Sequence, residues 1–175
     1  MTRRPTPAEA ADATRRWVVD VVVKLGLCPF AAAVVKPGRV RYAVCEGNSG
    51  GDALKLALEE ASLLLTTPPQ EVSTTLVIFP YALSNFHAFL DTVAEFEGAL
   101  SAVGADGIIQ VPSFHPDFVF QGADPDDPGN GTNRAPYPTL QLLREEEVTE
   151  AVDKHPDPEG IPKRNIALLR KLAGV

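Results

Sequence analysis

Apolar positions near the N-terminus recur with the spacing of a helix. The run Thr6-Pro7-Ala8-Glu9 has the pattern of a capping box with proline at the first helical position, which predicts a helix start. The valines of segment 18–25 fall largely on one face of this helix, and Gly26 is suited to end it. A valine-rich run is also compatible with a strand, but the capping pattern and the length favour a helix.

Three later segments have the composition of strands. Residues 39–46 (RVRYAVCE) alternate in polarity, residues 107–111 form a short apolar run, and residues 74–79 (TTLVIF) are β-branched and apolar throughout. The last pattern is typical of a strand buried on both faces. Amphipathic helices separate the strands, and Ser84 is the predicted N-cap of the second. Their apolar faces comprise Leu54, Leu58, Ala61 and Leu65 in the first helix and Phe86, Phe89, Leu90, Val93, Phe96 and Leu100 in the second.

This order of elements predicts one compact α/β domain over residues 1–175, with a small, mostly parallel sheet of about three to four strands flanked by helices. Residues 118–120 are a candidate fourth strand. Beyond residue 138 we expect a helix over 139–147, a second short helix to about Lys154 and a final helix over 165–173. Ligands of open α/β sheets gather outside the carboxyl ends of the strands. The turn at 47–51, the turn at 80–85 and the loop from Pro112 should therefore converge.

The segment 113–138 is the strongest candidate for a functional site. Loops this long are uncommon in compact domains and are usually functional or disordered. Aromatic residues of the segment, such as Phe114 and Tyr137, would anchor it in the fold, which argues against disorder. We therefore expect an ordered, site-forming loop.

Three residues are candidates for catalysis. His115 precedes a proline, which favours an extended backbone, and its imidazole suits acid–base chemistry near neutral pH. Asp117, two residues further on, is placed to orient that ring. Cys28, in GLCPF, is a candidate nucleophile if a neighbouring cation lowers its pKa, and otherwise a small buried apolar group. His115 could equally be a structural histidine that bonds loop carbonyls.

A second group of residues points to an anionic ligand. Arg134 offers a planar fork for a carboxylate or phosphate, and Asn133 can both donate and accept. Tyr137, between two prolines, would help to stiffen the backbone there, and Arg144 follows in LQLLREEE. Each of these residues has a structural alternative, such as tying the loop to a helix end.

Two weaker patterns remain. Asp124, Asp126 and Asp127 resemble the oxygen-rich ligand sets of hard cations, although the EF-hand pattern is absent from the sequence and turns favour Asp on their own. The glycine-rich turn at 47–51 could bind an anion at a helix start, but it matches neither a Walker A motif nor a dinucleotide fingerprint. We predict no metal ligands.

Charge and composition exclude several classes of protein. The net charge is −7, and Lys and Arg are scattered, which argues against a nucleic-acid surface. No stretch has the roughly 18 apolar residues of a membrane span, and the basic N-terminus lacks the apolar core of a signal peptide. We therefore expect a cytoplasmic protein without a membrane partner. Its two cysteines, Cys28 and Cys45, are expected to be thiols.

Four motifs are similar to those of a known family. GLCPF (26–30), FHPDF (114–118), TNRAPYPTLQLLRE (132–145) and IPKRNI (161–166) resemble an uncharacterised bacterial family, known as a domain of unknown function of about this length. The resemblance covers nearly the whole chain. It implies no established activity, substrate or cofactor.

Three functions follow from these observations. The first is an enzyme that acts on a small carboxylate- or phosphate-bearing molecule by His115–Asp117 acid–base chemistry, with Cys28 as a possible nucleophile. The second is a binding or regulatory module without catalysis. The third is a metal-dependent hydrolase that uses Asp117 and the acidic run at 124–127. The sequence indicates neither a cofactor nor an oligomeric state.

Overall fold

One five-stranded sheet forms the centre of the computed structural model, which describes residues 3–174. The strands are β1 (Val40–Val44), β2 (Thr74–Ile78), β3 (Ile109–Gln110), β4 (Ser113–Phe114) and β5 (Thr139–Arg144). Their order is β1-β2-β5-β3. Strand β4 pairs with the first residues of β5, along the same edge on which β3 pairs with its last residues. Strands β1 and β2 are parallel, whereas β5 runs antiparallel to β2, β3 and β4.

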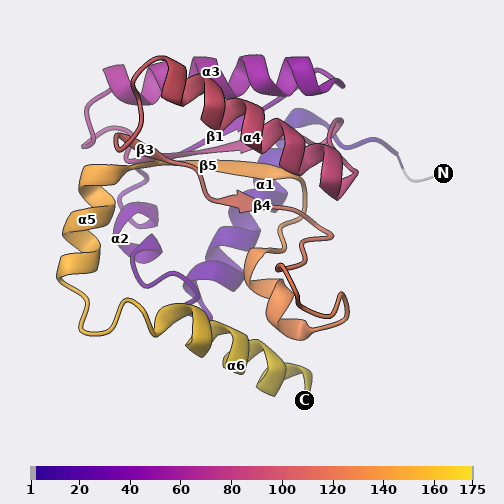
Figure 1. Cartoon of the computed structure of the whole chain (residues 1–175), viewed down its shortest axis with the longest axis vertical. Coiled ribbons are helices and arrows are strands. Elements are labelled where there is room, and N and C mark those ends of the chain that lie inside the picture. The colour runs from indigo at the N-terminus through magenta and orange to yellow at the C-terminus, as the bar shows by residue number, and fades with distance from the viewer. Residues whose placement is uncertain (1–2, 175) are drawn as a thin grey trace.

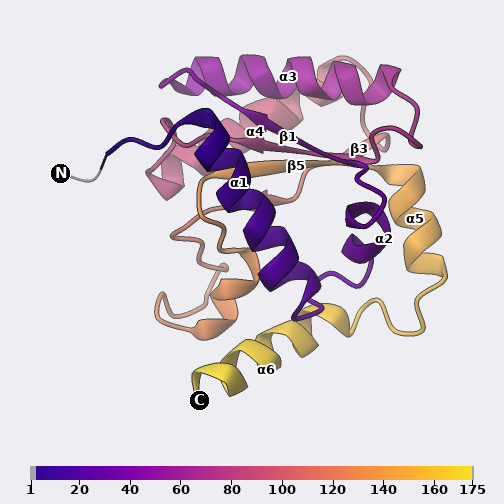
Figure 2. The same ribbon diagram turned by 180° about the vertical axis from the view of Figure 1, so that it is seen from behind.

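Helices cover both faces of this sheet (Figure 1). On one face lie α3 (Gly50–Thr66) and α4 (Phe86–Ala102), and on the other lie α1 (Pro7–Trp17), the π-helix η1 (Val18–Val23) and α2 (Ala31–Val35). Helix α5 (Glu145–Asp153) follows β5 and stands beside α2, and α6 (Ile161–Ala173) lies farthest from the sheet, as the reverse view also shows (Figure 2). A 3-10 helix, η2 (Pro128–Asn133), packs against α6.

The predicted α/β class is confirmed, but the prediction of a mostly parallel sheet is wrong. The four strands that precede residue 115 all point the same way, as expected from helical crossovers. Strand β5 then enters between β2 and β3 in the opposite direction. The sheet is therefore mixed, with its one reversed strand at an interior position.

The helix predicted over 139–147 is also wrong, because residues 139–144 form β5 and α5 begins at Glu145. Leu140 and Leu142 are buried against the α3–α4 side of the sheet, while Gln141 lies on the opposite face. This alternation has period two and is typical of a strand. Flanking strands on both sides supply the hydrogen bonds that override the helical tendency of LQLLREEE. Residues 118–120, the candidate fourth strand, form irregular loop after a turn at 116–117.

Local signals set the starts of the helices. Thr6 and Glu9 form the predicted capping box at α1. Ser49 and Asp52 form a second capping box at α3. The backbone N–H groups of these two residues, at the glycine-rich turn, therefore already donate to side-chain oxygens. At α4 the N-cap is Asn85, one residue after the predicted Ser84.

The two faces of the sheet are packed to different extents. The α3–α4 face has the larger core, which includes Phe79, Phe89 and Phe96. On the other face the buried cluster consists of Trp17, Val18, Leu76 and Ala135, with partly buried valines around it. The space between α1, α2, α5 and the sheet is thus only partly filled by side chains.

Candidate functional site

The residues predicted to form a site separate into two groups in the structure. Cys28, Asn133 and Arg144 line one cavity on the α2 side of the sheet. His115, Asp117, Arg134 and Tyr137 belong to the long loop and lie outside the residues that line this cavity. The structure therefore does not bring Cys28, His115 and Arg134 together in one cleft.

His115 holds the loop to the carboxyl edge of the sheet. Its side chain is fully buried, at 0% exposure, and packs against Phe86 and Phe89 with ring centroids 5.2 Å apart in each pair. Nε2 lies 3.0 Å from the carbonyl oxygen of Leu83, and Nδ1 accepts the backbone N–H of Asp117 at 3.0 Å. A carbonyl only accepts and an amide N–H only donates, so the ring is neutral with its proton on Nε2. Both ring nitrogens are used internally.

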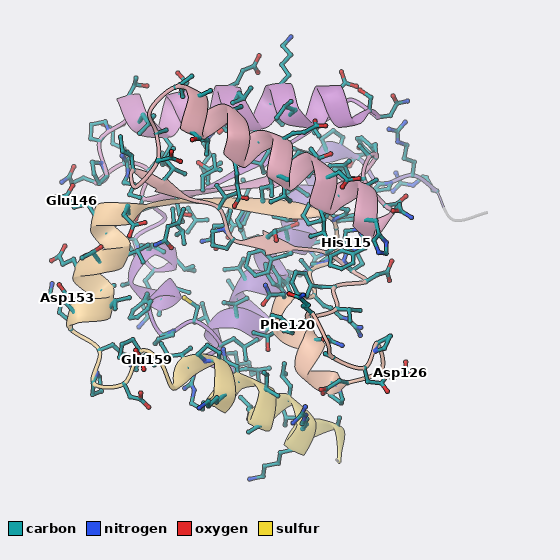
Figure 3. All side chains as sticks on the ribbon, in the orientation of Figure 1. His115, Phe120, Asp126, Glu146, Asp153 and Glu159 are labelled. Carbon is teal, nitrogen blue, oxygen red and sulfur yellow. The ribbon has the colours of Figure 1, made fainter. Side chains whose placement is uncertain are left out.

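Leu83 marks the point where two of the predicted converging connections meet. It is the non-glycine residue with positive φ (61°) in the described chain, 3–174, and its carbonyl is the one that His115 binds. Figure 3 shows His115 near the start of α4, with Asp126 at the outer tip of the loop. The expected convergence is therefore present, but buried side chains fill it.

Asn130 and Arg134 hold the rest of the loop. Asn130, 1% exposed, accepts the backbone N–H of Phe120 at 3.0 Å and donates to the carbonyl of Asp124 at 2.8 Å. Arg134 donates from Nε to the carbonyl of Phe118 at 3.1 Å and from Nη2 to that of Pro125 at 2.9 Å. These bonds use the fork that the sequence suggested for an anion.

The acidic residues of the loop act mainly on the backbone. Asp124 accepts the N–H of Asp126 at 2.8 Å, and Asp127 pairs with Arg170 of α6 at 2.6 Å. That guanidinium, together with the N–H of Gly129, holds the pKa of Asp127 at about 2. Within residues 3–174 there is no group of three or more His, Cys, Asp or Glu side chains that could hold a metal ion.

The cavity itself has a volume of ≈ 770 Å³. Its wall comes from α1 with η1, from α2, from the end of η2, from α5 and from the sheet. One wall is the segment 27–35, which Gly26 and Gly38 bracket in left-handed conformations with φ of 65° and 73°. The apolar lining residues are Trp17, Val18, Val22, Leu27, Pro29, Phe30, Ala31, Ala33, Val34, Val35, Val40, Leu76, Pro112, Phe114, Leu143, Val148 and Ala151.

Polar side chains lie on the sheet side of this cavity. Gln141 of β5 donates from Nε2 to Oγ1 of Thr74 at 3.2 Å, and both residues line the cavity. Asn133, at the end of η2, donates from Nδ2 to the carbonyl of Ser113 at 3.1 Å. The cavity thus combines a largely apolar wall with a few fixed hydrogen-bonding groups, as small-molecule sites do.

Charged residues gather at the α5 side of the cavity and pair with one another. Glu147 accepts the Ser73 hydroxyl at 2.7 Å and lies 3.7 Å from Nη1 of Arg39 and 3.8 Å from Nε of Arg144. The outward-facing acidic residues of this region, such as Glu146 and Asp153, lie on the far side of α5 (Figure 3).

Arg144 is also bonded to the backbone around the C-terminus of α3. Its Nη2 lies 2.6 Å from the carbonyl oxygens of Leu64 and Thr67 and 3.0 Å from that of Val72. A guanidinium at a helix C-terminus satisfies carbonyls that have no partner in the helix. These bonds occupy the group that was predicted to bind substrate.

Cys28 lines the cavity as a protonated thiol. Burial raises the pKa of this thiol, and the backbone N–H groups of Phe30 and Ala31 only partly offset the effect. A thiol with a raised pKa is a poor nucleophile at neutral pH. Cys45 is buried in the core, and both cysteines are free, as expected from the sequence.

Sequence reasoning missed Trp17, Thr74 and Gln141. Trp17 and Thr74 lie in a helix and a strand that were predicted, but nothing in the sequence marked these two residues as parts of a site. Gln141 was hidden by the prediction of a helix over 139–147, although the alternation of Leu140, Gln141 and Leu142 was the signal that could have located it.

The chain belongs to a family described as "Protein of unknown function (DUF1415)", whose model matches residues 9–174. This match confirms the resemblance to an uncharacterised domain-of-unknown-function family. No curated protein and no solved structure matches the chain. Of the helices in residues 3–174, none is both long and apolar enough to cross a membrane.

Proposed function

We propose that this protein binds a small, largely apolar organic molecule in the cavity between α1, α2, α5 and the sheet. The observation that supports this function is the cavity of ≈ 770 Å³, whose mainly apolar wall includes Trp17 and whose polar side includes Gln141 and Asn133. Sites for small molecules typically have volumes of about 300–1,000 Å³ and this same composition. Of the functions considered from sequence, a binding module fits best.

The chemistry of the cavity favours binding over acid–base catalysis. The lining residues include no histidine, and the Cys28 thiol has a raised pKa. Acid–base catalysis by His115 and Asp117 on an anion stays a prediction. It has less support, because both ring nitrogens of His115 bond to the backbone.

Binding can be tested with the uncharged probe N-phenyl-1-naphthylamine. Trp17 is the single tryptophan of the chain, and it lines the cavity. A probe bound there should accept excitation energy from Trp17, so tryptophan emission should fall and probe emission should rise, with saturation. The same probe should raise the melting temperature, because it binds only the native state.

A matched pair of variants tests whether the probe binds in this cavity. Val22→Phe adds volume on the cavity wall, whereas Val103→Phe makes the same change at a residue that is 75% exposed and outside the cavity. We expect the first to weaken probe binding severalfold and the second to leave it unchanged. Equal binding to both folded variants, or no saturable binding to the wild type, would contradict the proposal. Thermal melting checks that Val22→Phe is folded, and Val148→Phe offers a second cavity-filling change.

A further inference from the structure

We infer that the cavity selects an uncharged ligand that donates hydrogen bonds, and that the side-chain oxygens of Gln141 and Asn133 accept them. This inference rests on the proposed function, because it assigns the class of ligand to the same cavity. It differs from the sequence-based prediction of an anionic ligand. The argument depends on which way the two amides are turned and on which charges face the cavity.

The orientation of Gln141 is fixed through Thr74. The Thr74 hydroxyl lies 2.8 Å from the carbonyl oxygen of Leu142, which can only accept, so the hydroxyl proton is directed there. Oγ1 of Thr74 can then only accept from Gln141, and the atom 3.2 Å away must be the amide nitrogen. Oε1 of Gln141 has no hydrogen-bond partner among residues 3–174. It also keeps some accessible surface, because it is not one of the fully buried polar atoms without a partner.

The orientation of Asn133 follows from the same logic. The side-chain atom that lies 3.1 Å from the carbonyl oxygen of Ser113 must be Nδ2, because a carbonyl cannot donate. Oδ1 therefore points away from that bond, and no described residue between 3 and 174 donates to it. Both amides thus use an N–H internally and keep their oxygen for another partner.

The backbone of Gln141 and the side chain of Asn133 are anchored to adjacent residues of the chain. Asn133 binds the carbonyl of Ser113, and the backbone N–H of Gln141 donates to the carbonyl of Pro112 at 2.8 Å. Pro112 and Ser113 are neighbours in the chain, and both amide side chains line the cavity. A ligand with N–H or O–H groups at one end can therefore reach both acceptors, with the rest of it against the apolar wall.

The cationic side chains around the cavity are each held by groups of the protein itself. Arg39 donates to the carbonyls of Pro69 and Ala33 at 3.3 and 3.2 Å and lies 3.7 Å from Glu147. Lys154 pairs with Glu150 at 2.5 Å. Nη2 of Arg144 is directed at three backbone carbonyl oxygens, and its Nε lies 3.8 Å from Glu147. A carboxylate would also face two acceptor oxygens, which repel it, and its burial without a partner is costly.

Three naphthalene derivatives with the same ring separate donor capacity from charge. 2-Naphthamide donates N–H groups, methyl 2-naphthoate is uncharged but only accepts, and 2-naphthoate is an anion. Without acceptors, an apolar cavity would bind the ester more tightly than the amide, because the amide loses more hydration. We expect the reverse, with the amide about 5- to 10-fold tighter than the ester, as one to two net hydrogen bonds would give, and 2-naphthoate weakest.

Gln141→Leu removes the acceptor at similar size, and Gln121→Leu makes the same change on an exposed loop residue outside this cavity. The first variant should lose the preference for the amide while its affinity for the ester stays within about twofold, since only one to two hydrogen bonds distinguish the ligands. The second should behave as the wild type. Asn133→Leu is the second test if Gln141→Leu melts below the assay temperature.

Each outcome has one meaning. A preference for the amide that Gln141→Leu abolishes supports the inference. If the ester or 2-naphthoate binds the wild type as tightly as the amide, or if neither leucine variant alters the order, the inference is overturned but the cavity still binds the ring. If none of the three ligands binds the wild type, the inference and the proposed function both fail.

Discussion

Replacing Arg144 with methionine should destabilise the fold substantially. The side chain is 14% exposed, and its Nη2 lies within 3.0 Å of three backbone carbonyl oxygens around the end of α3. Methionine keeps much of the aliphatic stem but donates no hydrogen bond. The change therefore removes the charge, leaves the carbonyls without their donor and leaves Glu147 with one cation fewer.

The magnitude follows from the number of hydrogens available. Nη2 has two, so at most two of the three contacts are full hydrogen bonds at one time. Bonds from a charged donor contribute about 1.5–3 kcal/mol each. Two such bonds give roughly 3–6 kcal/mol, and water that reaches the freed carbonyls lowers this to about 3 kcal/mol. For a chain of this size, that loss corresponds to a fall in Tm of about 6–12 °C.

Urea titration and calorimetry of Arg144→Met measure this loss directly. Arg16→Met is the control, because Arg16 is exposed on α1 and its side chain has no ion pair or hydrogen bond with the rest of residues 3–174. Its unfolding free energy should stay within about 0.5 kcal/mol of the wild type. If Arg144→Met melts within about 2 °C of the wild type, the stabilising role deduced from the carbonyl contacts is refuted.

Three further predictions concern the loop and the thiol. Asn130→Ala should lower the free energy of unfolding in urea by about 1–3 kcal/mol, because it leaves buried backbone groups of the loop without partners; an unchanged urea midpoint would contradict this. Because the pKa of Asp127 is about 2 when folded and about 4 when unfolded, its pairing with Arg170 stabilises the fold above about pH 4, and this contribution is lost as the pH falls through about 2. The difference in urea midpoint between the wild type and Arg170→Ala should therefore shrink from pH 5 to pH 2, and a constant difference would argue against the ion pair. Cys28 should react slowly with a disulfide reagent near neutral pH and faster as the pH rises, since burial raises its pKa; N-phenyl-1-naphthylamine should slow the reaction, and Cys28→Ser, which leaves Cys45, gives the background rate.

Local signals in the sequence were sufficient for most of the elements. The capping box at Thr6 gave the start of α1, and the buried pattern of 74–79 gave β2 with nearly correct bounds; the single helix predicted up to Gly26 is α1 followed by the π-helix η1, which ends at Val23. In both cases the information lies within a few residues of chain, in a cap or in a run of β-branched side chains. Strand β5 could not be found in this way, because its state depends on strands far away in sequence that pair with both of its edges.

The candidate site shows the same division. Cys28, Asn133 and Arg144 line the cavity as parts of a predicted site, although the predicted site residues of the long loop, His115, Asp117, Arg134 and Tyr137, do not. His115 does lie at the convergence of loops, but sequence cannot show that Leu83 and Asp117 occupy both ring nitrogens. Gln141 became visible as a site residue only when its strand was known. The sequence thus identified residues with reactive side chains, but it could not show whether the polar atoms of these side chains already have hydrogen-bond partners in the fold.

The interior position of β5 has a consequence for how the chain folds during synthesis. Until residue 144 has left the ribosome, β2 and the β3–β4 segment present unpaired edges, and the helices α3 and α4 cover a sheet with a missing centre. Such open edges are prone to intermolecular pairing. A fragment that stops before Thr139 should therefore aggregate instead of forming a smaller stable domain, and completion of the sheet should be a late event that requires contacts between residues far apart in the chain.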